Sequence, residues 1–117
     1  MVDQLREFKA GIFQALANPT RIAIIDLLRE EGEATVGRIQ DLLRIEQSNA
    51  SQHLSVLRGK QIVLTRKAGN LVYYRLRDEL LGQVLDLMRV YFQNQLSAVT
   101  NLLANMDPDS NNAPAQQ

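Results

Sequence analysis

The residues best suited to molecular recognition lie in one short stretch, residues 47–58, which reads QSNASQHLSVLR. Glutamine, asparagine and serine side chains all donate and accept hydrogen bonds, so they match the edges of nucleic-acid bases. At about 100° per residue on a helix, the polar side chains that share one face are Ser48, Gln52 and Ser55, flanked by Asn49 and Ser51. A helix exposed only to solvent more often carries Glu–Lys pairs four residues apart. The pattern therefore indicates a helix that approaches DNA bases.

The other side of this helix is apolar, with Ala50, Leu54 and Leu57 at inward-facing positions. His53, the only histidine, lies beside that stripe. It has two interpretations, a metal- or base-binding ligand or a packed, hydrogen-bonded side chain. We favour the second, because the helical angle of His53 places it next to the core.

Two segments rich in β-branched and aromatic residues follow, residues 62–67 and 71–76. Gly69-Asn70 between them is a two-residue hairpin signal. In the register that this turn implies, Arg66 lies opposite Tyr73. We expect a hairpin wing whose tip projects toward DNA phosphates or an adjacent minor groove. The side chains at this tip are Arg66, Lys67 and Asn70.

The net charge of zero hides an uneven distribution of charge along the chain. Residues 44–77 contain seven basic side chains and one acid, Glu46, a net charge of +6. Binding to a polyanion depends on such a local positive surface and not on the total charge. The predicted phosphate contacts are Arg58, Lys60, Arg66 and Lys67.

Three helices are predicted ahead of this stretch, over residues 2–16, 19–29 and 36–43. Asn18 suits the cap of the second helix and Pro19 its first position, and Gly32 suits its end. Thr35 is expected to cap the third helix. The inward positions predicted for the second helix are Ile22, Ile25 and Leu28. With a tight turn over residues 44–46, the third and fourth helices form a helix-turn-helix.

A last helix is predicted over residues 78–106, about 43 Å long, which exceeds what a domain of this size covers. Its apolar residues follow alternating spacings of four and three, typical of a helix that packs on a partner helix. The predicted dimer interface comprises Leu5, Phe8, Ile12, Leu81, Leu85, Met88, Phe92, Val99, Leu102 and Met106. A second stripe is expected to pack on the chain's own domain and comprises Leu80, Val84, Leu87 and Tyr91. The stripe after Tyr91 also allows a small-molecule pocket between subunits, although plain dimer packing is favoured.

Composition limits the remaining possibilities. The chain has 117 residues and no cysteine, which excludes disulfides and thiolate metal sites. No apolar run approaches the roughly 18 residues of a membrane helix, so we expect a cytoplasmic protein without a membrane partner. Residues 1–106 are predicted to form one domain, mainly α with a small β-hairpin wing. Residues 107–117 are predicted to be a disordered tail.

Taken in order, these segments resemble the ArsR/SmtB family of winged helix-turn-helix repressors. The matching stretches are LANPTRIAIIDLL, QSNASQHLSVLR and GNLVYYRL. The resemblance implies a homodimeric repressor that binds an inverted-repeat DNA operator and is released by an effector. It also implies base and phosphate contacts from Gln47, Ser48, Ser51 and Gln52, with wing contacts around Arg66.

The family's usual metal ligands are absent from the matching positions. Thr35 and Gly37 stand where metal sensors of the family carry two cysteines, and Leu80 stands where a histidine is usual. A cation held by Asp78, Glu79 and Asp86 is the weaker interpretation of those acids, since acids at a helix N-terminus need no such role. We therefore predict no metal, no cofactor and an unidentified non-thiol effector, for which a small molecule is one candidate; the sequence does not show whether there is an effector at all.

Two other classes of function have less support in the sequence. A winged-helix module that binds protein and not DNA is the alternative, supported by the zero net charge and by Glu46 where the family usually has serine. An enzyme is not expected, because no nucleophile–base pair or paired buried carboxylates are predicted from these residues.

Overall fold

A computed structural model describes residues 2–106, so the predicted tail at 107–117 lies outside the described residues. The chain forms two compact units, one ending at Gly82 and one beginning at Gln83. Within the described range, no helix is both long and apolar enough to cross a membrane.

Helix α2 (Pro19–Glu31) begins at Pro19 as predicted and ends at Glu31, two residues beyond the predicted end at Arg29. The Asn18 side chain accepts hydrogen bonds from the backbone N–H groups of Thr20 and Arg21, at 2.9 and 3.1 Å. Gly32 ends the helix at φ 85° and donates its N–H to the Leu28 carbonyl. That backbone conformation favours glycine because it has no Cβ.

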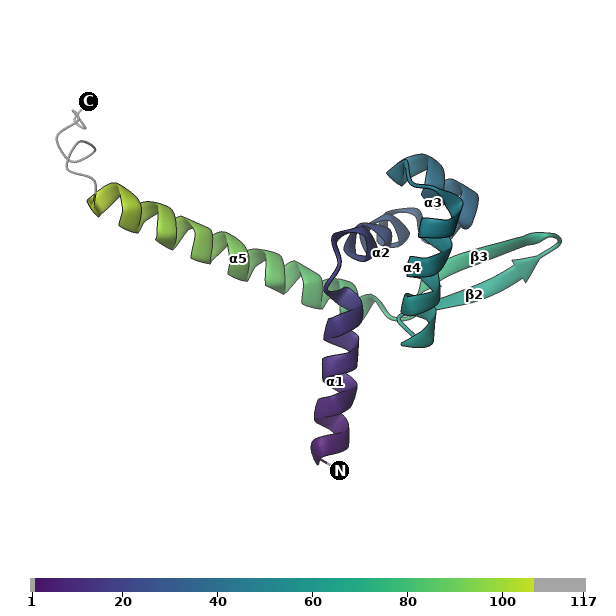
Figure 1. Ribbon diagram of the computed structural model, residues 1–117, viewed down its shortest axis with the longest axis horizontal. Helices are drawn as coiled ribbons and strands as arrows, with labels where there is room; N and C mark the ends of the chain where they lie inside the picture. The colour runs from purple at the N-terminus through teal and green to yellow at the C-terminus, as the bar shows by residue number, and fades with distance from the viewer. Residues whose placement is uncertain (1, 107–117) are drawn as a thin grey trace. The chain divides into compact units, whose positions relative to one another are not determined.

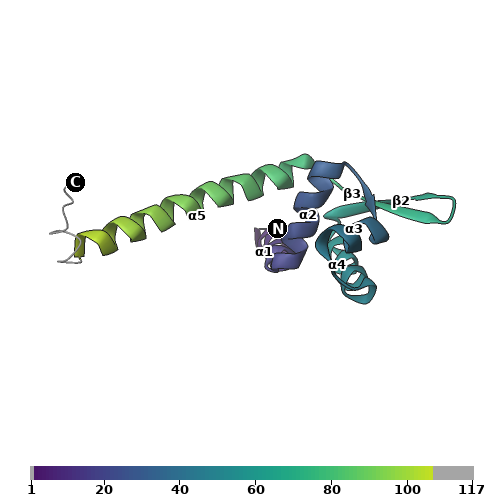
Figure 2. The same ribbon diagram turned by 90° about the horizontal axis from the view of Figure 1, so that it is seen from above.

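Helices α3 (Val36–Leu43) and α4 (Gln47–Gly59) form the predicted helix-turn-helix against α2. Figures 1 and 2 show these three helices gathered together, with the hairpin extending away from them. The core positions of α4 are confirmed, but in α2 Ile24 is fully buried while Ile22 is only half-buried. The largest fully buried side chains are Ile24, Ile25, Leu28, Ile39, Leu54, Leu57 and Val63.

The wing consists of β2 (Val63–Ala68) and β3 (Leu71–Leu76), joined by the predicted turn at Gly69-Asn70. The predicted pairing of Arg66 with Tyr73 is confirmed. A third strand, β1 (Ala34–Thr35), was not predicted and pairs antiparallel with the far edge of β3. It is only two residues long, so hydrophobic alternation leaves no signal for it.

Helix α1 (Val2–Leu16) contacts α2, and its buried residues are Ala15 and Leu16 near its end. Helix α5 (Glu79–Met106) is 28 residues long, about 42 Å. The second stripe of α5 was predicted to pack on the chain's own domain. Leu80 lies in the first unit and is 62% exposed there. Val84, Leu87 and Tyr91 lie in the second unit, so their packing on the first stays a prediction. Periodicity identifies an apolar face but not which surface covers it.

Candidate nucleic-acid interface

The outer face of α4 is a polar surface with free hydrogen-bonding groups. Ala50, Leu54 and Leu57 anchor the helix to the core with at most 1% of each exposed. On the outer side every predicted contact residue is exposed, and within residues 2–106 none of their side chains has a hydrogen-bond partner. These residues are Gln47, Ser48, Asn49, Ser51, Gln52 and Ser55. Their donors and acceptors are therefore available to a ligand.

The N-terminus of α4 is set by the turn that follows α3. Arg44 adopts a left-handed conformation at φ 57° and donates its N–H to the Gln40 carbonyl at 2.7 Å. Glu46 then stands at the N-cap of α4, exposed and without a side-chain capping hydrogen bond. Its carboxylate is favoured there by the helix dipole, but it does not satisfy the first N–H groups as serine would.

His53 is held by an arginine that the sequence did not single out. The Arg21 side chain donates Nε–H to the Ala15 carbonyl at 2.5 Å, and its Nη1 lies 3.2 Å from His53 Nδ1. This confirms the packed, hydrogen-bonded interpretation of His53. Burial, with a smaller effect of the Arg21 charge, lowers the pKa of His53. The neutral His53 ring, which accepts a hydrogen bond from Arg21, is thus the favoured state, and Arg21 joins the end of α1 to α4.

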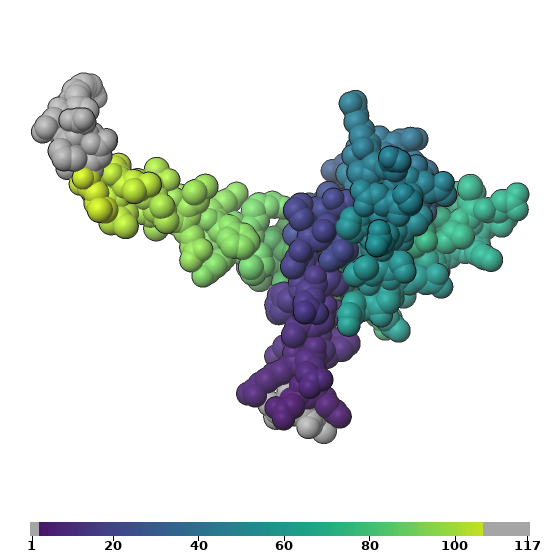
Figure 3. Space-filling view, viewed as in Figure 1, coloured from purple at the N-terminus to yellow at the C-terminus, as the bar shows by residue number. Residues whose placement is uncertain are grey.

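The wing carries the remaining predicted contacts, but Arg66 does not project freely as expected. It forms an ion pair with Glu33 at 2.5 Å and lies over the Tyr73 ring, 4.6 Å from its centroid. The hydrogen bond from Arg66 lowers the pKa of Glu33. Lys67 and Asn70 are exposed near the tip, as predicted. In Figure 3 the hairpin protrudes beyond the teal surface of α3 and α4.

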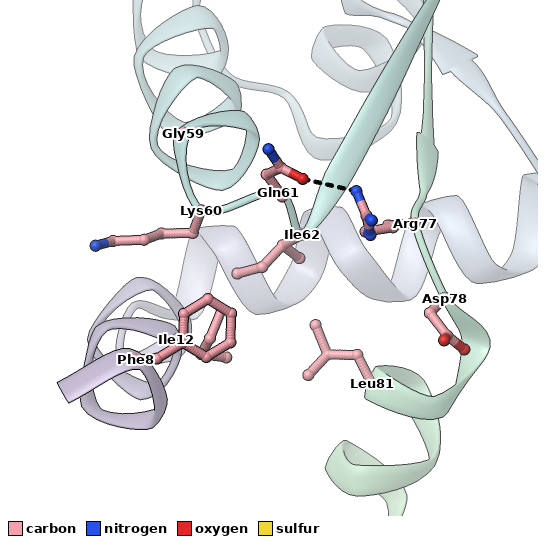
Figure 4. Close-up of a pocket in the computed structure, with 9 residues that line it drawn as sticks. All are labelled: Phe8, Ile12, Gly59, Lys60, Gln61, Ile62, Arg77, Asp78 and Leu81. Atoms are coloured by element: carbon pink, nitrogen blue, oxygen red, sulfur yellow. Dashed lines mark hydrogen bonds between the residues drawn. The ribbon is translucent and has the colours of Figure 1, made fainter. Parts of the chain in front are cut away.

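Arg58 and Lys60 are both exposed near the end of α4 but point in different directions. Arg58 lines a hollow of about 320 Å³ together with Arg75 of the wing. Lys60 instead extends over α1, where the absence of a side chain at Gly11 leaves room for its ammonium group (Figure 4). The structure thus brings Arg58 close to the wing and separates Lys60 from it.

Lys60 borders a larger cavity of about 670 Å³ between α1, the end of α4 and the start of α5. Phe8, Ile12, Ile62 and Leu81 give it an apolar wall, and Arg77 is held at its edge by Gln61 at 2.7 Å (Figure 4). Three of these apolar residues belong to the predicted dimer interface. Among residues 2–106 there is no group of three or more His, Asp or Glu side chains arranged to hold a metal ion.

The helix-turn-helix, the three-stranded sheet and the projecting hairpin define the chain as a winged helix-turn-helix protein. A family model for a helix-turn-helix domain matches residues 16–66. The nodulation protein NolR of Rhizobium meliloti is 34% identical over 93 residues, covering 80% of this chain and 75% of NolR. The arsenical resistance operon repressor of Escherichia coli K12 is also 34% identical, covering 86% of this chain and 91% of the repressor.

Solved structures agree with these relatives. The solution structure of a homodimeric winged helix-turn-helix DNA-binding domain from Mycobacterium bovis, named as a possible ArsR-family transcriptional regulator, superposes with a TM-score of 0.73. It is 30% identical and covers 82% of this chain and 88% of that domain. The chain belongs to the ArsR family of winged helix-turn-helix transcriptional regulators, which is a family of regulators and not of enzymes.

Proposed function

We propose that the protein is a homodimeric transcriptional repressor that binds an inverted-repeat operator. The observation that carries this proposal is the outer face of α4, whose glutamine, asparagine and serine side chains are exposed without partners in the described chain. A helix of this kind fits the major groove, where such side chains read base edges. The two recognition helices of a dimer then contact half-sites about one helical turn apart.

The exposed apolar surface of α5 supports the dimer. None of the ten predicted interface residues is fully buried in the single chain, and Phe92, Leu102 and Met106 are 58, 58 and 68% exposed. An apolar surface of this extent on a soluble chain marks an interaction site. The Mycobacterium bovis relative, whose domain is homodimeric, favours a second copy as the partner.

Release from the operator requires an effector that binds the DNA-incompetent state more tightly than the DNA-competent state. The chain has no cysteine, so the effector acts without thiol chemistry. We expect a small molecule that changes the geometry of the dimer.

The test is binding of the full chain to duplex DNA from upstream of its own gene, measured by fluorescence anisotropy against a shuffled duplex. Gln52→Ala is expected to reduce the preference for the upstream duplex by roughly 5- to 150-fold, equivalent to about 1–3 kcal/mol. The matched control is Gln93→Ala, which removes an exposed glutamine from the polar side of α5. Arg66→Ala is expected to reduce the slope of log binding constant against log salt concentration by about one.

Equal preference for both duplexes in the wild type and all variants would refute sequence-specific repression. Failure to bind either duplex at low salt would favour the protein-interaction alternative, because a DNA-binding surface retains nonspecific, salt-dependent affinity.

A further inference from the structure

The ion pair between Arg66 and Glu33 has a geometry that leaves part of the arginine free. Arg66 Nη2 donates to Glu33 Oε1 at 2.5 Å, and Nε donates to Oε2 at 3.3 Å. Both contacts use the side edge of the guanidinium. Within residues 2–106, Nη1 has no hydrogen-bond partner. A guanidinium carries five N–H groups in a fixed fork, so its end edge, with Nη1 and the second Nη2 hydrogen, stays available.

Three strands bring these groups together. Tyr73 on β3 pairs with Thr35 of β1 on one side and with Arg66 of β2 on the other. Glu33 lies two residues before Thr35, and the guanidinium carbon of Arg66 lies 4.6 Å from the Tyr73 ring centroid. The ring supports one face of the guanidinium by a cation–π contact. Together the acid and the ring restrict a long side chain that would otherwise sample many rotamers on the wing.

We propose that Glu33 and Tyr73 are positioning residues that hold the end edge of Arg66 ready to bind a DNA phosphate. Arginine binds phosphate bidentately through two parallel N–H groups, and the free edge offers such a pair. The inference rests on the proposed DNA-binding function and extends it to two residues that do not themselves contact DNA. The alternative is that Glu33 competes with phosphate for Arg66 and so weakens DNA binding.

The two possibilities predict opposite effects of Glu33→Gln on DNA affinity. They differ once the general gain in affinity from removing an acid is subtracted. A neighbouring pair supplies that control, because Glu31 binds Arg38 Nε at 3.0 Å in the same region of the chain. Glu31→Gln and Glu33→Gln each remove one partly exposed negative charge, with side chains 27 and 35% exposed, and one ion pair with arginine. The difference between the two variants therefore isolates the contact with Arg66.

The experiment measures binding of the full chain to its upstream duplex and to an unrelated duplex over a range of salt concentrations. We expect Glu33→Gln to bind both duplexes at least threefold more weakly than Glu31→Gln, because a phosphate contact is independent of sequence. Tyr73→Leu should also weaken binding to both duplexes. In an Arg66→Lys background, which keeps the charge but lacks the fork, Glu33→Gln and Glu31→Gln should be indistinguishable.

If Glu33→Gln binds as tightly as Glu31→Gln or more tightly, the positioning role is refuted while DNA binding stands. If the difference persists in the Arg66→Lys background, Glu33 acts through another residue and the inference also fails. Wild-type protein that binds neither duplex overturns both this inference and the proposed function. Circular dichroism and thermal melting of each variant establish that the wing and core remain folded.

Discussion

The contacts of Arg21 give the most direct test of how the recognition helix is held. Arg21→Met keeps an apolar stem of similar length but removes every donor. In the wild type, Nε donates to the Ala15 carbonyl at 2.5 Å, Nη2 to the Gln14 carbonyl at 3.4 Å, and Nη1 lies 3.2 Å from His53 Nδ1. The variant leaves two carbonyls at the end of α1 and one ring nitrogen of α4 without these partners.

The size of the effect follows from these three contacts. A hydrogen bond from a charged donor contributes about 1.5–3 kcal/mol when well buried. Arg21 is half-buried and two of its contacts are long, so screening by solvent reduces the sum. We expect Arg21→Met to lower the free energy of unfolding by about 2 kcal/mol. A double-mutant cycle with His53→Ala should give a coupling energy of about 1 kcal/mol.

Urea denaturation followed by circular dichroism measures these values, with all variants at one protein concentration because the proposed dimerisation would make stability depend on concentration. Arg6→Met is the matched control, since Arg6 is 75% exposed and, within residues 2–106, pairs only with Asp3 on the same helix. It should change the unfolding free energy by less than about 0.5 kcal/mol. If Arg21→Met costs no more than Arg6→Met, the tie between α1 and α4 does not contribute to stability and the reasoning is wrong.

Four further outcomes are expected. The pKa of His53 is lowered below its usual 6.5, so the unfolded chain takes up this proton first. Stability should therefore fall as the pH drops below about 6.5, and His53→Gln should show a shallower fall in urea denaturation. Asn18→Ala should cost about 1 kcal/mol of stability by the same method, and Asn18→Asp much less, because aspartate retains the cap. Glu46→Gln should tighten binding to unrelated duplex about threefold in anisotropy titrations, the effect of one charge about 7 Å from a phosphate in water; unchanged binding would place Glu46 away from the DNA. Leu102→Asp should shift the sedimentation of the full chain toward monomer and Gln93→Asp should not; if both remain dimeric, α5 is not the interface.

Local signals in the sequence predicted most of the fold. The helix caps were predicted correctly at Asn18, Gly32 and Thr35. Caps and positive-φ turns depend on a few adjacent residues, so the local sequence is enough to identify them. The outward face of α4 was predicted equally well, since helical periodicity assigns every residue to a side. Predicting the caps and the outward face of α4 therefore requires only the residues of that segment.

The features that sequence reasoning missed all join residues distant along the chain. Arg66 and Glu33 are 33 residues apart, and Arg21 and His53 are 32 apart. Any exposed arginine has several acids it could reach, and only the pairing of β1 with β3 decides the partner of Arg66. The second stripe of α5 stays a prediction for a related reason, because an apolar face does not specify which surface covers it. The DNA contacts and the dimer interface stay predictions.

The exposed apolar side chains of α5 are expected to make the lifetime of the protein in a cell depend on the amount that is made. Large apolar side chains along α5 are exposed in the single chain from Leu80 to Met106. A newly synthesised copy without a partner therefore presents the kind of surface that chaperones and proteases recognise. In the proposed homodimer a second copy hides that surface, so we expect degradation to remove single copies faster than dimers. Falling synthesis would then deplete the regulator more than proportionally, and we expect a threshold in the response of the genes that it is proposed to regulate.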